Sequence, residues 1–127
     1  MESIEIIANG SYIPKNKVTN AILAKQLGIT EEYIFKRTGI KQRFFASEAE
    51  SIENMATNAA KDALEKAKVE KEKIDMIVVA TTATECFMPG ISYQVQRQLD
   101  IKECICFDLL AKNLCLIPVL LKIYSSV

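Results

Sequence analysis

The sequence predicts an α/β fold in which a mainly parallel sheet is flanked by helices. Two short aliphatic runs, 74–80 (IDMIVVA) and 104–108 (CICFD), have the composition of strands that are covered on both faces. A helical pattern precedes the first run and another lies between the two, so strands and helices alternate. This order favours a parallel pair of strands joined by a helical crossover.

The composition sets limits on the function. The 127 residues suit one domain, and with half of them apolar and a quarter charged we expect an ordered core over residues 1–127. Sixteen basic residues balance sixteen acidic ones, which argues against nucleic acid or an anionic membrane as partner. The chain has no histidine, so it supplies no imidazole as base, acid or metal ligand.

The first half of the chain predicts short elements. Residues 3–8 form a candidate strand that ends at an Asn-Gly turn. Asn20 is the expected N-cap of a helix over 21–27, which a glycine ends. Thr30 is the expected cap of a second helix over 31–37, and two glutamates in its first turn complement the helix dipole. Residues 41–46 are expected to be extended.

The clearest helix begins after Ser51. Steps of three and four residues place its apolar side chains on one stripe: Ile52, Met55, Ala56, Ala59, Ala60, Ala63, Leu64 and Ala67. A loop over 81–90 then leads from the first aliphatic strand into a helix over 91–99. Residues 110–127 have no clear period, and they form a divergent terminus.

The cysteines and the ends of the chain indicate a reduced, cytoplasmic protein. Cys86, Cys104, Cys106 and Cys115 lack the spacing of a zinc site, so no metal is expected, and we interpret them as reduced thiols packed as small hydrophobes. Residues 1–10 carry two glutamates and do not resemble a secretory signal. The apolar stretch 113–121 is shorter than the roughly 20 residues that span a bilayer, so no membrane association is expected.

Several short motifs taken together resemble β-ketoacyl-acyl-carrier-protein synthase III, a condensing enzyme of the thiolase fold. The matching residues are Gly10–Pro14 (GSYIP), 31–34 (EEYI), 37–40 (RTGI), 77–82 (IVVATT), Pro89, Gln94, Gln96 and Phe107-Asp108. The resemblance covers residues 1 to about 109. It implies a thiolase-like fold of which this chain holds an incomplete first half.

The resemblance also implies a reaction. Members of the family are homodimeric acyltransferases of fatty-acid biosynthesis, which condense an acyl-coenzyme A with malonyl-acyl-carrier protein and release carbon dioxide. Coenzyme A thioester and acyl carrier protein are then the partners, and no separate cofactor is implied. A cysteine at the start of a buried helix is the nucleophile, and a histidine and an asparagine further along the chain stabilise the enolate.

The matched nucleophile position is not a cysteine in this sequence. Counting from Phe107 as the family does leads to Asn113, and the nearest thiol, Cys115, lies two residues later between leucines. Cys115 is therefore a weak candidate nucleophile and otherwise a packed thiol. We interpret residues 110–127 as a shifted reading frame or an aberrant terminus, and whether the chain is an enzyme by itself stays open.

Two groups of residues are expected to bind ligands or a second subunit on the strength of the resemblance. Tyr33, Arg37 and Thr38 match the positions that hold coenzyme A; alternatively, Arg37 ends a helix and Tyr33 packs in the core. Phe87 and Met88 match a loop that reaches the partner's acyl pocket in the family dimer; alternatively, they fold onto their own core.

The sequence leaves three functions open. The first is the N-terminal fragment of a synthase III that is inactive alone. The second is a non-catalytic module that binds coenzyme A. The third is one half of a split synthase, which would pair with a chain that carries the histidine and the asparagine.

Overall fold

The chain forms two compact units. The computed structural model describes residues 5–82, 88–110 and 117–121. Residues 13–51 make one unit, here called the hairpin unit, and residues 1–12 with 52–127 make the other, here called the sheet unit. The expectation of a single domain over 1–127 stays a prediction.

The hairpin unit pairs two short strands and two short helices. Strand β1 (Asn16–Thr19) leads directly into helix α1 (Asn20–Leu27), and helix α2 (Glu31–Thr38) precedes strand β2 (Gln42–Phe45). The two strands are antiparallel, with Asn16 opposite Phe45 and Thr19 opposite Gln42. Both helices and the extended segment were predicted, whereas β1 was not.

The helix ends follow the capping residues. Thr30 caps α2 by accepting a hydrogen bond from the Tyr33 amide, at 3.2 Å, as predicted. Gly28 and Gly39 adopt left-handed conformations, with φ of 68° and 67°, just beyond the ends of α1 and α2. Such a conformation is costly for residues that carry a Cβ, so these glycines stop the helices.

The prediction that Asn20 caps α1 is wrong. Thr19 is the cap, and its hydroxyl accepts a hydrogen bond from the Ile22 amide at 3.5 Å. Asn20 is buried instead, where its amide donates to the Ile40 carbonyl and its oxygen accepts from Arg43 Nη2, both at 2.8 Å. A buried amide needs both partners, so Asn20 joins α1 to the β2 side of the hairpin.

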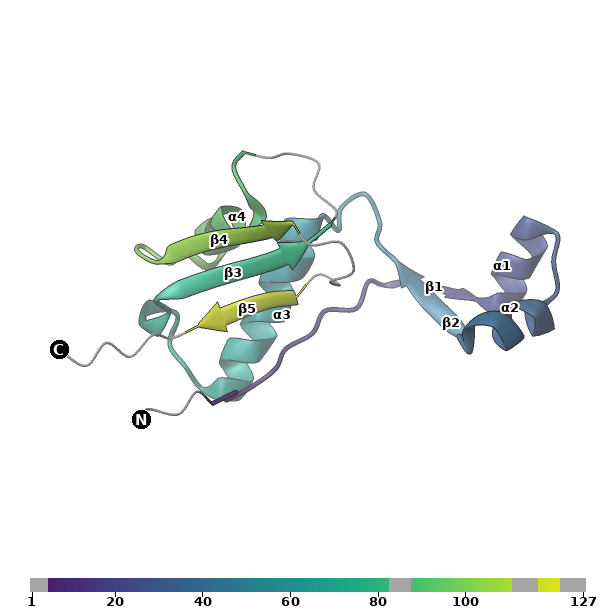
Figure 1. The fold of residues 1–127 in the computed structure, drawn as a ribbon, viewed down its shortest axis with the longest axis horizontal. Coiled ribbons are helices and arrows are strands. Elements are labelled where there is room, and N and C mark those ends of the chain that lie inside the picture. Colours follow the sequence, from purple (N-terminus) through teal and green to yellow (C-terminus); the bar gives the residue numbers. More distant parts are fainter. Residues whose placement is uncertain (1–4, 83–87, 111–116, 122–127) are drawn as a thin grey trace. The chain divides into compact units, whose positions relative to one another are not determined.

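The sheet unit has a three-stranded sheet with two helices on one face (Figure 1). Its elements are helix α3 (Ile52–Ala67), a 3₁₀ turn (Lys71–Lys73), strand β3 (Met76–Thr81), helix α4 (Ile91–Leu99), and strands β4 (Ile105–Leu110) and β5 (Ile117–Leu121). The strand order is β4-β3-β5. The α/β class and both long helices agree with the sequence prediction.

The core of the sheet unit lies between β3 and the two helices. Ile77 and Val79 of β3 and Val95 of α4 are fully buried, and Ala56 and Ala60 let α3 approach the sheet closely. Burial of each isoleucine or valine side chain contributes about 1.5–3 kcal/mol to stability. Because α3 packs on the sheet along one face, its apolar residues follow the helical period that predicted it from the sequence.

The sheet is mixed rather than wholly parallel. Strands β3 and β4 are parallel, as expected, with Val78 opposite Phe107. Strand β5 is antiparallel to β3, and it places Pro118 opposite Val79. No strand was predicted over 117–121, because residues 110–127 have no clear period. An edge strand tolerates a proline, since one side of its backbone needs no partner.

The predicted strand over 3–8 is absent from its described residues, 5–8. Strand β3 has both of its edges occupied, one by β4 and one by β5. The segment instead runs along α3, where the Ser11 amide donates to Asp62 Oδ2 at 2.8 Å (Figure 1). Gly10 lies so close to this helix that a Cβ would overlap Ala59 O and Ala63 N. Ile6 stays 89% exposed.

Candidate functional site

Helix α2 brings together two of the three residues expected to bind coenzyme A. Tyr33 and Arg37 are one turn apart, and the guanidinium carbon of Arg37 lies 5.4 Å from the centre of the Tyr33 ring. That distance is within the range of a cation–π contact. Tyr33 is 52% exposed and Arg37 is also exposed, so the tyrosine ring is not a core residue.

Thr38 has a different environment from the other two. Its hydroxyl donates to the Ile34 carbonyl at 2.8 Å and accepts from the Ile40 amide at 3.1 Å. These two bonds satisfy backbone groups at the end of α2. The described contacts of Thr38 are therefore those of a helix-terminating residue.

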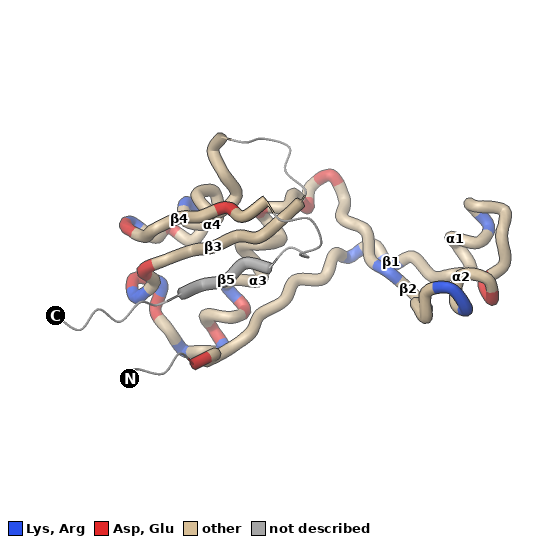
Figure 2. Tube along the Cα trace, in the orientation of Figure 1, with Lys and Arg blue, Asp and Glu red and all other residues tan. Residues whose placement is uncertain are grey.

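The hairpin unit carries an excess of positive charge, although the whole chain is neutral. Residues 13–51 contain seven lysines and arginines against four glutamates, a formal charge of +3. Charges of both signs are present in each unit (Figure 2). On α2, Lys36 pairs with Glu32 at 2.7 Å, but both side chains are exposed, so the pair contributes little. An anionic ligand would meet a favourable field here.

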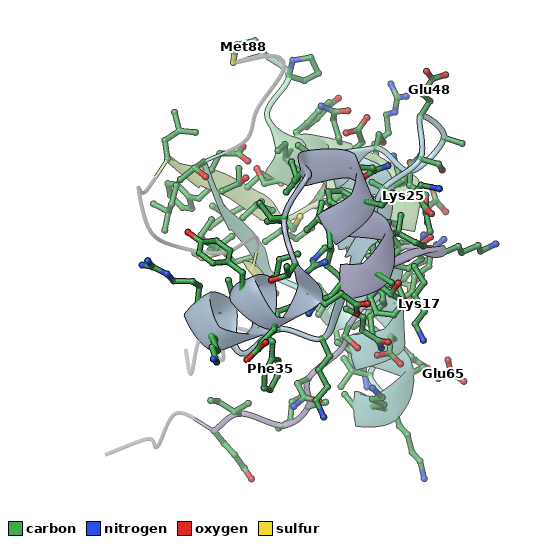
Figure 3. The ribbon with its side chains drawn as sticks, turned by 90° about the vertical axis from the view of Figure 1, so that its right-hand side faces the viewer. Lys17, Lys25, Phe35, Glu48, Glu65 and Met88 are labelled. Carbon is green, nitrogen blue, oxygen red and sulfur yellow. The ribbon has the colours of Figure 1, made fainter. Side chains whose placement is uncertain are left out.

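The aromatic side chains of the hairpin unit face solvent. Phe35 projects from α2 (Figure 3), and the ammonium of Lys41 lies 6.0 Å from the centre of its ring. Phe44 and Phe45 on β2 are also exposed. Exposed aromatic side chains beside cations suit a ligand that combines a flat ring with phosphates.

The remaining predicted site residues lie elsewhere in the chain. Asn113, Cys115 and Phe87 lie outside the described residues. Met88 is 83% exposed and extends from the loop before α4 (Figure 3), so it does not fold onto its own core.

A second polar cluster, which the sequence interpretation did not assign, joins β4 to α4. Asp108 accepts two hydrogen bonds from Ser92, from the amide at 3.0 Å and from the hydroxyl at 2.7 Å. Ser92 lies in the first turn of α4, where a carboxylate also complements the helix dipole. Gly90 leaves room for this carboxylate, because a Cβ there would overlap Asp108 Oδ2.

The same strand carries two thiols. Cys104 and Cys106 are free and half-buried, whereas Cys86 and Cys115 lie outside the described residues. Burial, followed by the hydrogen bond with Cys104, raises the pKa of Cys106 to about 12. A thiol with such a pKa is protonated at neutral pH and is a poor nucleophile. Across the described ranges, no group of three or more His, Cys, Asp or Glu side chains could hold a metal ion.

The face of β4 opposite Cys106 is apolar and open. Ile105, Phe107 and Leu109 alternate along the strand, and each has half of its surface exposed. Met76, Val78 and Ala80 lie opposite them on β3. Contiguous exposed apolar side chains are typical of surfaces that bind another chain or a ligand. Within residues 5–82, 88–110 and 117–121, no helix is long and apolar enough to cross a membrane.

Solved structures share this fold. The 3-oxoacyl-[acyl-carrier-protein] synthase III of Aquifex aeolicus superposes with a TM-score of 0.77 at 43% identity, over 81% of this chain and 33% of that one. The priming β-ketosynthase of the R1128 polyketide pathway gives a TM-score of 0.79 at 35% identity, over 82% of this chain and 31% of that one. The fold is thus part of the thiolase-like fold of condensing enzymes.

Curated sequences are similar to most of this chain. β-Ketoacyl-[acyl-carrier-protein] synthase III 1 of Vibrio parahaemolyticus is 44% identical over 107 residues, and the Shigella flexneri synthase III is 43% identical over the same length. Each match covers 84% of this chain and 34% of the relative. No protein-family profile matches the chain. The chain is a homologue of β-ketoacyl-acyl-carrier-protein synthase III, and it spans about a third of the length of the curated relatives it matches.

Proposed function

We propose that this chain is the N-terminal portion of a β-ketoacyl-acyl-carrier-protein synthase III and that helix α2 supplies its coenzyme A platform. The observation that carries the proposal is the exposed Tyr33–Arg37 pair, with 5.4 Å between guanidinium and ring centre. The ring offers a flat face to adenine, and the guanidinium can bind a phosphate with two parallel hydrogen bonds. The charge of +3 on the hairpin unit favours a ligand that carries phosphates.

The reaction of the whole enzyme would be the decarboxylative condensation of an acyl-coenzyme A with malonyl-acyl-carrier protein. Acyl carrier protein is then a partner, and the enzyme is a cytoplasmic homodimer. The 127 residues include no histidine, and Asn113 stands where the family has its nucleophile. We therefore expect no condensation by this chain alone. Met88 would line the acyl site of a second subunit.

The proposal is tested by calorimetric titration of the full chain with coenzyme A. Native chain is expected to bind, and Arg37→Ala is expected to weaken binding at least tenfold, which corresponds to about 1.4 kcal/mol. Tyr33→Ala is expected to weaken it less, because stacking alone is lost. Lys25→Ala, on α1 of the same unit (Figure 3), removes the same charge and is the matched control, with an expected change below twofold.

Three results test the role of α2 and the absence of catalysis. Equal losses for Arg37→Ala and Lys25→Ala would mean that only net charge matters, and they would remove α2 as the platform. Arg37→Lys keeps the charge without the planar fork, so it is expected to recover only part of the affinity. Binding of coenzyme A with no product from acetyl-coenzyme A and malonyl-carrier protein is expected both for the inactive N-terminal portion and for the non-catalytic module, and formation of product would contradict both.

The open row on β4 favours a second candidate, one half of a split synthase. Ile105, Phe107 and Leu109 would then pack against a chain that supplies the remaining two thirds of the fold. Co-expression with the histidine-containing part of a synthase III would yield a complex that forms with native chain but not with Phe107→Asp. A native chain that stays monomeric beside that part would refute this candidate.

A further inference from the structure

Cys104 and Cys106 form a pair whose geometry suits a shared ligand. Cys104 directly precedes β4 and Cys106 is the second residue of that strand, so both side chains lie on the same face. Their sulfurs are 3.7 Å apart. Cys106 Sγ also donates to Gln96 Oε1 of α4 at 3.4 Å, a contact that holds this thiol in place. Both residues are half-buried, so a small reagent can reach them.

The spacing favours a bridging atom over a disulfide bond. Two residues of an extended segment span about 6.6 Å between Cα atoms, close to the upper limit of about 6.8 Å for disulfides. The sulfurs would also have to approach from 3.7 Å to about 2.05 Å. In contrast, two bonds of about 2.3 Å, the length of a zinc–thiolate bond, meet at about 107° when the sulfurs are 3.7 Å apart. A pyramidal or tetrahedral centre accommodates this angle without movement of the strand.

The number of thiols in the site determines which ion or compound they can bind. A structural zinc ion requires four protein ligands, whereas in the described part of the chain no third His, Cys, Asp or Glu completes a metal-binding group. A monosubstituted trivalent arsenical requires only two thiols, because its third bond is to carbon. We propose that Cys104 and Cys106 form a dithiol site that captures a monosubstituted trivalent arsenical.

The capture step balances without an oxidant. An organoarsenic oxide reacts with the two thiols, its arsenic–oxygen double bond and both S–H bonds break, two arsenic–sulfur bonds form, and one water leaves with both protons. Arsenic stays trivalent and both sulfurs keep their oxidation state. Because the protons leave as water, the overall reaction releases none to the solution.

The test uses the reduced full chain and phenylarsine oxide as the probe. Intact mass spectrometry is expected to show one phenylarsenic group per chain, with two of the four thiols lost to titration. Tryptic cleavage after Lys102 and Lys112 releases a peptide, 103–112, that contains Cys104 and Cys106 and no other cysteine. The group is expected on this peptide, which locates the site without any substitution.

Variants and a thiol challenge complete the test. Cys104→Ser and Cys106→Ser are each expected to lose the retained adduct, while the double variant Cys86→Ser/Cys115→Ser keeps it. Dithiothreitol should displace the group, whereas about a hundredfold more 2-mercaptoethanol should not, because two linked bonds dissociate far less readily than one. A group found on another peptide, or retained by either single variant, would overturn the proposal.

Discussion

Replacing Asp108 with alanine is expected to destabilise the sheet unit by more than is usual for the substitution of an exposed residue. Its carboxylate accepts both hydrogen bonds from Ser92, at 3.0 Å from the amide and 2.7 Å from the hydroxyl. Ser92 is 1% exposed in the native chain, so both of its donors depend on the carboxylate as their acceptor. An unsatisfied buried donor costs about 1–3 kcal/mol. Two donors are left without their acceptor, and relaxation of the first turn of α4 offsets part of the cost. We therefore expect the free energy of unfolding to fall by about 2–4 kcal/mol.

Urea unfolding followed by circular dichroism measures this loss. With a slope of about 2 kcal/mol per molar urea, a loss of 3 kcal/mol lowers the midpoint by about 1.5 M. Ser92→Ala removes only the hydroxyl donor and should cost less, about 1 kcal/mol. The double variant should cost less than the sum of the two single losses, because the residues share one interaction.

Asp100→Asn is the matched control for the loss of an acidic residue. Asp100 follows α4 with φ of 56°, a conformation that asparagine also tolerates, and its carboxylate is exposed beside Lys71. We expect no measurable change in its urea midpoint. A midpoint for Asp108→Ala that equals the native value would show that the Ser92 donors find other acceptors, and the reasoning would then fail.

Three further predictions concern other parts of the chain. Gly10→Ala should cost about 1–3 kcal/mol in urea unfolding, because its Cβ would overlap the backbone of α3 at Ala59; a native-like midpoint would mean that the segment can leave the helix. Thr30→Ala removes the cap that the Tyr33 amide uses and should cost about 1 kcal/mol, or about 4 °C in thermal unfolding, whereas Thr30→Ser should recover most of it. Iodoacetamide should alkylate Cys106 slowly at pH 7 and about tenfold faster per pH unit as the pH rises toward its pKa of about 12; a rate that levels off near pH 9 would contradict the raised pKa. Because the folded chain holds this proton more tightly than the ordinary pKa of 9.0 would allow, its contribution to stability is complete below pH 9 and is lost as the pH rises through 12.

The elements that the sequence predicts well are those decided by local pattern. The stripe of α3 and the glycine stops of α1 and α2 depend on residues within one or two turns. The cap of α1 was misassigned by one residue because Thr19 and Asn20 are both good caps. Only the tertiary contact of Asn20 with Arg43 decides between them.

Strand pairing was harder to predict because it depends on distant residues. Residues 5–8 have a strand-like pattern, yet they do not pair with β3. Strand β4 occupies one edge of β3 and strand β5 occupies the other. The Asp108–Ser92 cluster was missed for the same reason, since its members are sixteen residues apart. One signal was available: a glycine, Gly90, directly before a helix, where close approach of another group is common.

The Tyr33–Arg37 pair was located through a resemblance together with helical spacing. Positions one turn apart on a helix necessarily meet, so the contact follows once α2 is recognised. The positive charge of the hairpin unit was overlooked because the two units offset each other in the total. Charge counted by unit is thus a better guide than charge counted over the chain.

The hairpin unit has a smaller core than the sheet unit, and this difference affects hydrogen exchange. Among the described residues, the buried apolar side chains of the hairpin unit are Ala24 and Ile34, whereas the sheet unit has ten. Amides of α1 and α2 should therefore exchange with deuterium through local opening, at a lower free energy than those of α3 and β3. Coenzyme A bound to α2 would slow exchange in residues 13–51 and leave exchange in strand β3 unchanged, so the exchange map would show which unit holds the ligand.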